Sequence, residues 1–600
     1  MLIPMSLKDS GGSFGSFDAL RKATQGDASP EPTPESPEEE KGWTLLSGDD
    51  EEYELTEEEL AALPPLEANT PGRISNRPPG FGPMDTGPDC YRDSNSEELG
   101  ILRSFRLRTI FPDDVLGETR DLPANPRPDD LKGRLDLRDQ LIFTIDGADA
   151  KDYDDAVQIE PIGEGGFRLG VHIADVSHYV REGSILDDEA LTRGTSVYLA
   201  DQVVPMLPEE LSNGLCSLVP DQDRLAFSVF MEFDKHGERT ASSFSKSVIR
   251  SKKRTTYRVI QELLDGEQND ETEAIAFLKP TLEHFRTWTR KQQALRDAKG
   301  SLRMQSKEKR FRFDDKHEPV EIYFSPKYFS QTLIEETALA ANQAVGDFFV
   351  KQGLPTIYRV HPEKDPEEAE QVMAMLDKIG IRVPKKQRLT GRDIGRMIRL
   401  ARKRANAEAL VQRIMGLVEK AVYEVKDHED VAEHWGLARK AYLHFTSPIR
   451  RYPDLIVHRW LHAVLTEDEQ AITQLKGEGM LLELNTTATH ASHQANFAEM
   501  AERAIFDLKV CQFMEPKIGD ILEAKVIRVN RAGMEIELVG LNVTGFLPSR
   551  SIGDRPKCEG STLTIQQGKR LLSFSEGYPI RILVEDVDFL KLQVMLALAT

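Results

Sequence analysis

The alternation of hydrophobic and polar positions divides the chain into a strand-rich part, a helix-rich part and a second strand-rich part. Short apolar or alternating runs predict strands at 141–145, 156–160, 167–176, 226–233 and 244–249, with turns at 163–166 and 234–237. After residue 255, apolar residues recur every three or four positions, which predicts helices at 256–264, 331–350, 366–379, 391–404, 453–465 and 481–513. No linker rich in proline or glycine interrupts 135–514. We therefore expect one large α+β domain, in which helices surround a mixed β-sheet.

Two shorter segments flank this domain. Residues 96–134 hold a few spaced apolar residues ahead of a Phe-Pro pair and are predicted to be a lead-in segment. Residues 517–600 return to short strands around a turn at 530–533. A segment of this size with about five strands fits a small all-β OB barrel.

Residues 1–95 differ in composition from the rest of the chain. They carry 12 of the 33 prolines of the chain. Residues 1–100 hold 22 acidic and 7 basic side chains, and so account for most of the net charge of −23 of the whole chain. Such a segment buries too little apolar surface to offset chain entropy, so we predict a disordered acidic tail. A solvated tail is favoured, with a docking peptide for a protein partner at 56–63 as the alternative. Since most of the negative excess lies here, the net charge does not exclude nucleic acid as a partner.

Several classes of protein are disfavoured by what the sequence lacks. The cysteines are far apart and form no CxxC pair, which argues against a disulfide framework and a structural zinc site. No run approaches the ~20 apolar residues of a membrane span, and the first residues do not resemble a signal peptide. We therefore expect a cytoplasmic monomer without a membrane partner.

Four aspartates between two predicted strands are the strongest chemical signal. Asp146, Asp152, Asp154 and Asp155 separate the apolar runs LIFTI and AVQI. Carboxylates crowded between buried strands repel one another unless a cation neutralises them, and oxygen ligands without histidine or cysteine suit Mg²⁺. Four carboxylates suffice for two ions ~3.5–4 Å apart, an arrangement used on phosphodiesters. A solvated turn is less consistent with the flanking strands, and an EF-hand loop is excluded by its ligand positions. A structural metal site stays open.

A basic segment near the end of the helical part is the second signal. Arg450 and Arg451 follow a Thr-Ser-Pro loop, and Pro453 stands where a helix is predicted to begin. Arginine presents a fork of donors that matches phosphate oxygens. The alternative is that these arginines form ion pairs with nearby acids such as Asp454.

Together these segments resemble the ribonuclease II/R family, whose catalytic module is the RNB domain. The resemblance runs from about residue 97 to the C-terminus, where the barrel is similar to an S1-type OB domain. Its motifs are TIDGADAKDYDDAV, HIADVSHYV, TSVYLADQVVPMLPEELSNGLCSL, IRSKKRTTY, YRVHPEKD and HFTSPIRRYPDLIVHR. The two cold-shock OB domains that commonly precede the RNB domain are not recognisable here, which predicts a weaker grip on RNA.

The resemblance implies processive, Mg²⁺-dependent hydrolysis of single-stranded RNA from the 3′ end to nucleoside 5′-monophosphates. By motif, Asp146, Asp152 and Asp155 would be metal ligands, and Asp154, at or beside the metals, would be the most sensitive carboxylate. Arg450 would neutralise charge on the scissile phosphate. The alternative to a nuclease is a catalytically silent member of the family that binds RNA and has a regulatory role. The presence of all four aspartates and of Arg450 disfavours this alternative. A phosphodiesterase acting on DNA is a third hypothesis.

The resemblance also implies positions that contact RNA. Tyr198 would stack on bases near the 3′ end, Phe311 (or Phe313) would oppose it, and Glu502 would lie near the terminal nucleotide. Further predicted RNA-binding residues are Lys246, Arg250, Lys253 and Arg254 in one motif, and Phe546 in the barrel. Ala532 stands where such barrels often place a stacking aromatic, so the barrel is expected to bind mainly through charge.

Overall fold

The computed structural model describes residues 44–46, 52–54, 96–299, 301, 308–362, 364–378, 380–381, 391–404, 407–426, 433–559 and 561–599. The predicted tail, including 56–63, therefore lies outside the described residues, except for the antiparallel strands β1 (Thr44–Leu46) and β2 (Glu52–Glu54). These two short strands were not predicted. None of the helices described here is long and apolar enough to cross a membrane.

A five-stranded sheet forms the centre of the large domain. Its order is β3 (Leu135–Asp136), β10 (Arg239–Arg250), β9 (Asp223–Phe233), β6 (Gly166–Ala174) and β5 (Asp155–Ile162). Neighbouring strands are antiparallel except that β3 runs parallel to β10. Nearly every residue of β6 and β9 is buried, because both faces of the sheet are covered. Beside this sheet, β4 (Thr144–Asp146) pairs in parallel with β11 (Arg254–Thr256).

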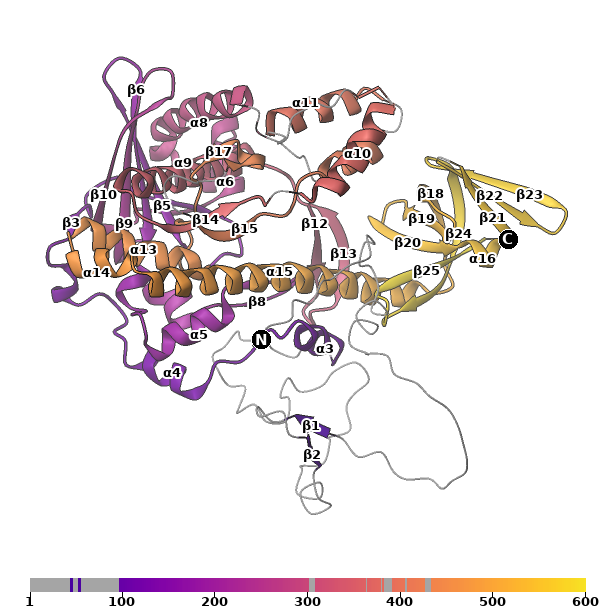
Figure 1. The fold of residues 1–600 in the computed structure, drawn as a ribbon, viewed down its shortest axis with the longest axis horizontal. Coiled ribbons are helices and arrows are strands. Elements are labelled where there is room, and N and C mark those ends of the chain that lie inside the picture. The colour runs from indigo at the N-terminus through magenta and orange to yellow at the C-terminus, as the bar shows by residue number, and fades with distance from the viewer. Residues whose placement is uncertain are drawn as a thin grey trace.

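Three helices cover one face of this sheet, as Figure 1 shows. Trp288 of α8 (Lys279–Lys299) packs on Phe233, and His458 of α13 (Tyr452–Leu465) packs on Phe227, two positions on the same side of β9. Phe244, on β10, contacts α9 (Phe329–Gln352). The main hydrophobic core lies in this layer. The α+β class is confirmed, whereas α8 was not predicted.

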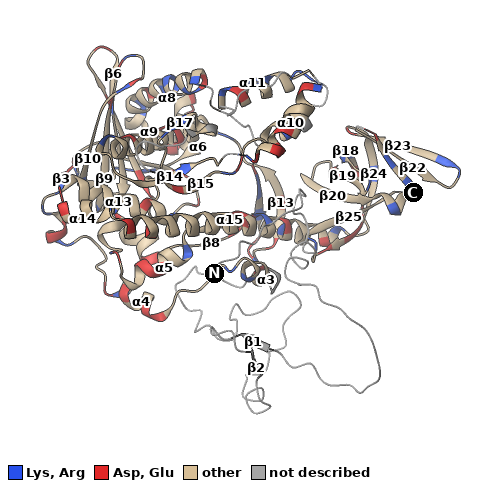
Figure 2. Cartoon of the chain, viewed as in Figure 1, with Lys and Arg blue, Asp and Glu red and all other residues tan. Residues whose placement is uncertain are grey.

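The other elements of the large domain surround this core. The helices are α3 (Ser96–Ser104), α4 (Asp113–Arg120), α5 (Ile185–Arg193), α6 (Tyr257–Asp265), α7 (Asp270–Glu273), α10 (Pro366–Lys378), α11 (Gly391–Ala401), α12 (Ala407–Met415) and α14 (Glu469–Leu475). The short strands are β7 (Val197–Tyr198), β8 (Val203–Val204), β12 (Lys309–Phe313), β13 (Pro319–Phe324), β14 (Thr356–Val360), β15 (Val422–Lys426), β16 (Glu433–His434) and β17 (Arg439–Lys440). Basic and acidic residues are interspersed along these elements (Figure 2).

One long helix, α15 (Glu478–Met514), connects the large domain to the C-terminal barrel (Figure 1). Its first half contributes Leu484 and Ala491 to the main core, and its end contributes Phe513 and Met514 to the barrel core. The same helix therefore belongs to both hydrophobic cores and fixes the barrel beside the large domain.

The barrel is closed by five strands, which confirms the predicted OB architecture. They are β18 (Ile521–Val529), β19 (Gly533–Leu538), β20 (Val543–Pro548), β24 (Pro579–Asp588) and β25 (Gln593–Leu598). A short helix α16 (Ser549–Ile552) and an additional sheet of β21 (Asp554–Glu559), β22 (Thr562–Gln567) and β23 (Arg570–Ser575), which was not predicted, are inserted between β20 and β24. Phe546 is half-buried on β20, and a Cβ atom at Gly533 would approach its ring to 2.7 Å. The missing side chain at Gly533 therefore makes room for this aromatic ring.

Candidate active site

The four aspartates occupy the connection between two strands that lie next to each other. Asp146 ends β4, and Asp155 begins β5. A bridge between Phe143 and Val157 aligns the two strands, so both ends of the acidic loop are fixed by backbone pairing. The register thus brings together carboxylates that the sequence separates by up to nine positions.

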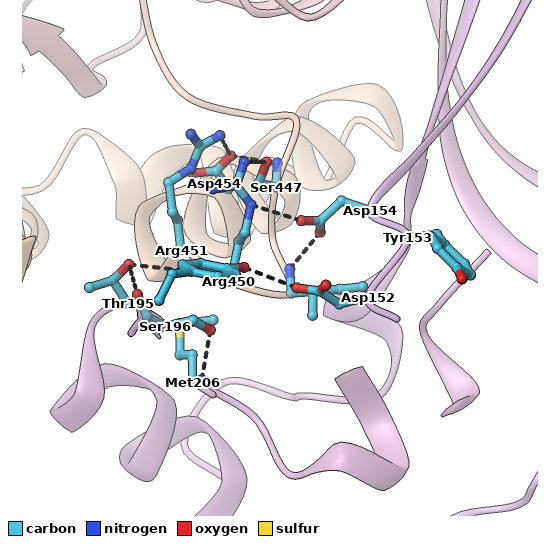
Figure 3. A network of polar contacts seen from close by, with 12 residues as sticks. Asp152, Tyr153, Asp154, Thr195, Ser196, Met206, Ser447, Arg450, Arg451 and Asp454 are labelled. Carbon is cyan, nitrogen blue, oxygen red and sulfur yellow. Dashed lines mark hydrogen bonds and ion pairs between the residues drawn. The ribbon is translucent and has the colours of Figure 1, made fainter. Parts of the chain in front are cut away.

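Asp154 connects this loop to the distant basic segment. Its Oδ1 accepts a hydrogen bond from the backbone N–H of Ile449 at 3.0 Å, and its Oδ2 lies 3.3 Å from Nε of Arg450. The Asp154 side chain is 5% exposed, so these contacts form largely away from water. Figure 3 shows the carboxylate turned toward the guanidinium. The structure therefore places the two predicted catalytic residues in direct contact.

The two arginines of the basic segment have different partners. Arg451 forms a double hydrogen bond with Asp454, at 2.9 and 2.7 Å, which is the ion pair that the sequence left open. Arg450 is turned to Asp154 instead, and its Nη2 donates to Oγ of Ser447 at 2.9 Å (Figure 3). The backbone of Arg450 is also held, because its carbonyl accepts from the N–H of Ser196 at 3.0 Å. Ser447 and Ser196 were not predicted as site residues, since their role appears only when the segments meet.

Burial makes the negative charges of this cluster costly. Desolvation raises the pKa of Asp146 to about 8, and the charge of Asp155 raises it further in the same direction. Desolvation also raises the pKa of Asp154 to about 8 and that of Asp155 to about 6, although the Arg450 charge opposes both shifts. One arginine therefore does not neutralise the cluster, and additional positive charge would stabilise it.

The donor set fits a hard divalent cation. Oδ2 of Asp146 is buried and has no hydrogen-bond partner, so it is available as a ligand. The surrounding candidate ligands are all carboxylate oxygens, which Mg²⁺ prefers. Within the described part of the chain, however, no three histidine, cysteine or acidic side chains already converge around one point. The site thus supplies suitable donors without a closed coordination shell.

A large cavity opens beside the acidic loop. Its volume is about 1480 Å³, and its lining includes Asp152, Tyr198, Phe311, Phe313 and Glu502. The Tyr198 hydroxyl donates to Oδ2 of Asp152 at 3.0 Å, and Oε1 of Glu502 accepts from the backbone N–H of Tyr198 at 2.9 Å. The structure therefore brings together the three positions predicted to contact the 3′ end and joins them to a predicted metal ligand.

The two candidate aromatics on β12 differ in exposure. Phe311 is 8% exposed and packs against Phe506 of α15, with ring centroids 4.7 Å apart. Phe313 is only half-buried. Both rings line the cavity, and Phe313 is the more exposed residue of the two.

Two of the basic residues predicted to bind RNA are engaged by acids of the protein. The ammonium group of Lys246 is 2.5 Å from Asp175 and 2.9 Å from Oγ of Ser177, with its side chain 14% exposed. Arg250 is paired with Asp223 at 2.7 Å. The structure thus gives Lys246 a role inside the domain in place of the expected RNA contact, because the alternation along β10 turns it toward a buried carboxylate.

The other two basic residues support the acidic loop. Nη2 of Arg254 donates to the backbone carbonyls of Gly147 and Ala148, at 3.0 and 2.6 Å. The backbone carbonyl of Lys253 accepts from the N–H of Thr144 at 3.1 Å, next to the pairing of β11 with β4. Arg254 therefore holds the loop that begins directly after Asp146, a contact that sequence alone could not show.

The chain is similar in sequence to known protein families. A model of the RNB domain matches residues 134–467, and a model of the S1 RNA binding domain matches residues 515–590. The chain belongs to the RNB family. It is 38% identical over 452 residues to ribonuclease R of Thermotoga maritima, covering 74% of this chain and 62% of that protein. It spans about three fifths of the length of the curated RNB relatives that it matches.

Two solved structures share the fold of this chain. The ribonuclease R of Mycoplasma genitalium, solved with ribose-methylated single-stranded RNA, matches with a TM-score of 0.72 and 26% identity, over 84% of this chain and 79% of that one. A yeast pseudonuclease matches with a TM-score of 0.58 and 18% identity, over 79% and 58% of the two chains. Since a protein described as a pseudonuclease shares this fold, the RNB fold alone does not establish catalysis.

Proposed function

We propose that this chain is a divalent-metal-dependent exoribonuclease that degrades single-stranded RNA processively from its 3′ end. The products are nucleoside 5′-monophosphates. The observation that carries the proposal is the contact of Asp154 with Arg450 and the Ile449 N–H, beside carboxylates whose charge is not neutralised. Relatives named ribonuclease R, and a structure of one of them with single-stranded RNA, support this substrate class.

Each residue of the cluster has a role that its contacts support. Asp146, Asp152 and Asp155 would hold Mg²⁺, which supplies an activated water and charge for the leaving oxygen when bound. Asp154 and Ser447 fix the orientation of Arg450, since they accept from its Nε and Nη2, while the Arg450 side chain stays 40% exposed. Arg450 then stabilises the charge that develops on the phosphate oxygens.

The cavity provides the surface on which the 3′ end would lie. Tyr198 and an aromatic of β12, Phe311 or Phe313, offer flat faces for unpaired bases, which stack without strong sequence preference. Glu502 positions Tyr198 through its backbone N–H. The expected monomeric state, cytoplasmic location and protein partner for the acidic tail stay predictions from the sequence.

A catalytically silent RNA-binding protein is the second candidate, because a pseudonuclease shares the fold. Retention of the four aspartates and of Arg450, in mutual electrostatic contact, favours the nuclease. A silent protein would not need to keep carboxylates that burial makes costly.

The decisive test uses RNA and DNA oligomers labelled at the 5′ or the 3′ end, with Mg²⁺ or with EDTA. We expect 3′-labelled RNA to release labelled mononucleotide at once, whereas 5′-labelled RNA in excess over protein is converted to a short end product without a ladder of intermediates, in Mg²⁺ only. Asp149→Asn is a matched control, because Asp149 is an exposed aspartate of the same loop. RNA that is bound but not shortened would indicate the silent protein, and equal cleavage of DNA would contradict the RNA specificity.

A further inference from the structure

A second cavity, of about 330 Å³, lies on the side of the domain where α8, α9 and β17 meet (Figure 1). Its charged lining consists of Arg239, Arg296, Lys299, Arg439, Lys440, Glu238 and Asp347. Bases thus outnumber acids five to two in the lining, in a chain whose net charge is −23. Arg239 is paired with Asp347, and Arg296 with two acids outside the lining, so the excess positive charge comes from Arg439, Lys440 and Lys299. The volume falls in the lower range of small-ligand pockets. The local charge and the size both favour a small anion.

Arg296 reaches this cavity from the end of α8 with part of its guanidinium unsatisfied. Its side chain is 7% exposed, and Nη2 is paired with Glu335 and Glu336 at 2.9 and 3.0 Å. Its Nε is buried and has no hydrogen-bond partner. A buried donor without an acceptor costs free energy, which an acceptor in the cavity would recover.

Arg439, on β17, is a second arginine of the cavity lining with an unsatisfied donor. Its Nε is also buried without a hydrogen-bond partner, and no ion pair of this side chain is formed with the described residues. Burial lowers the pKa of Arg439, and the like charges of Arg296 and Arg239 lower it further, against the opposing charge of Glu336. All three guanidinium groups line the same cavity, and the charges of Arg296 and Arg239 both act against that of Arg439.

An amide adds a polar acceptor to this arrangement. Nε2 of Gln343 donates to Asp347 at 2.8 Å and to the carbonyl of Lys440 at 2.6 Å, which fixes the orientation of the amide. The opposite atom, Oε1, is buried and has no partner. It would accept from a hydroxyl group, whereas the guanidinium groups would donate to oxyanions.

We propose that this second cavity binds a phosphomonoester anion, with Arg439 and Arg296 donating to its oxygens and Gln343 accepting from a hydroxyl group. Guanidinium forks match phosphate oxygens, and a phosphomonoester combines oxyanions with a hydroxyl on the phosphorus or on its sugar. Inorganic phosphate and a 5′-mononucleotide share this chemistry. The proposal does not rest on the nuclease activity, because none of these residues belongs to the proposed catalytic cluster.

Isothermal titration of the full chain in EDTA, at constant ionic strength, tests this proposal with inorganic phosphate and with 5′-AMP in separate arms. We expect saturable binding with a Kd of about 1 mM or tighter. Arg439→Gln should weaken it at least tenfold, since charged hydrogen bonds to phosphate are lost. Arg570→Gln, an exposed arginine on β23, is the matched control and should bind like the wild type. Tighter binding of 5′-AMP assigns the mononucleotide, and equal binding assigns phosphate alone.

Two results would overturn the proposal. These are no binding of either anion up to about 10 mM, and unchanged binding in Arg439→Gln. If Arg439→Gln does not fold, as judged by its melting curve, Lys299→Gln decides, because Lys299 is a rim residue with its side chain 59% exposed. It should weaken binding about two- to threefold, and no change would equally refute the site.

Discussion

Replacing Asp154 by asparagine removes one charge from the proposed catalytic cluster with almost no change in shape. The amide oxygen can still accept from the N–H of Ile449, now 3.0 Å from the carboxylate. The amide nitrogen, however, would face Nε of Arg450, 3.3 Å from the oxygen it replaces, so that two donors oppose each other. Loss of such a charged contact at the reacting phosphate typically lowers a rate about 10²–10³-fold. We expect at least this loss in single-turnover RNA degradation.

The same substitution should leave the fold and RNA binding nearly unchanged. Burial raises the pKa of Asp154 and so already opposes its negative charge in the metal-free protein, and the amide keeps the size of the side chain and the acceptor for the Ile449 N–H. The free energy of unfolding should therefore change by less than about 1 kcal/mol, and the Kd for RNA by less than about threefold. Melting curves, fluorescence anisotropy and single-turnover kinetics measure the three quantities. Near-normal turnover in Asp154→Asn, or an equal loss in Asp149→Asn, would refute the assignment.

Four further outcomes follow from the structure. Tyr198→Ala should weaken RNA binding about tenfold in an Asp154→Asn background, whereas Tyr198→Phe keeps the stacking face; anisotropy distinguishes them. Arg254→Met, by freeing the loop carbonyls, should raise the half-saturating Mg²⁺ concentration about tenfold in steady-state kinetics. Lys246→Met should cost about 2 kcal/mol in urea unfolding, because buried Asp175 loses one of its two cationic partners and keeps Arg134, without changing the Kd for RNA. Since the pKa of Asp146 is raised to about 8, the metal-free fold retains a proton that the unfolded chain releases above about pH 4. Its stability should fall from pH 4 to 8, and Mg²⁺ should raise the melting temperature more at pH 8 than at pH 6, by scanning fluorimetry.

Elements with clear apolar periodicity could be predicted from sequence, and elements with polar inward faces could not. The spacing in 453–465 and 481–513 matches α13 and α15 closely. Helix α8 was missed because Thr289, Gln292 and Arg296 occupy buried positions where apolar residues are expected. Two of these polar residues, Gln292 and Arg296, line the second cavity. The interruption of the apolar periodicity in α8 therefore corresponds to a polar pocket.

The sequence was enough to predict which residues belong to the candidate site, but not which of them contact one another. The composition of the acidic loop indicated a cation, and its motif selected Asp154 and Arg450. Arg450, and not Arg451, contacts Asp154, because Arg451 is paired with Asp454. Only the fold determines this choice. Lys246 shows the opposite case, because a basic residue in a family motif proved to be buried against a carboxylate.

The central claim is that the aspartates of the β4–β5 connection bind divalent cations beside Arg450. Anomalous diffraction from crystals of the full chain soaked in Mn²⁺, which replaces Mg²⁺ at oxygen sites, tests it most directly. We expect peaks within coordination distance of Asp146, Asp152 and Asp155, and their loss in crystals of Asp152→Asn. Peaks confined to other parts of the molecule, with these carboxylates free of metal, would contradict the account.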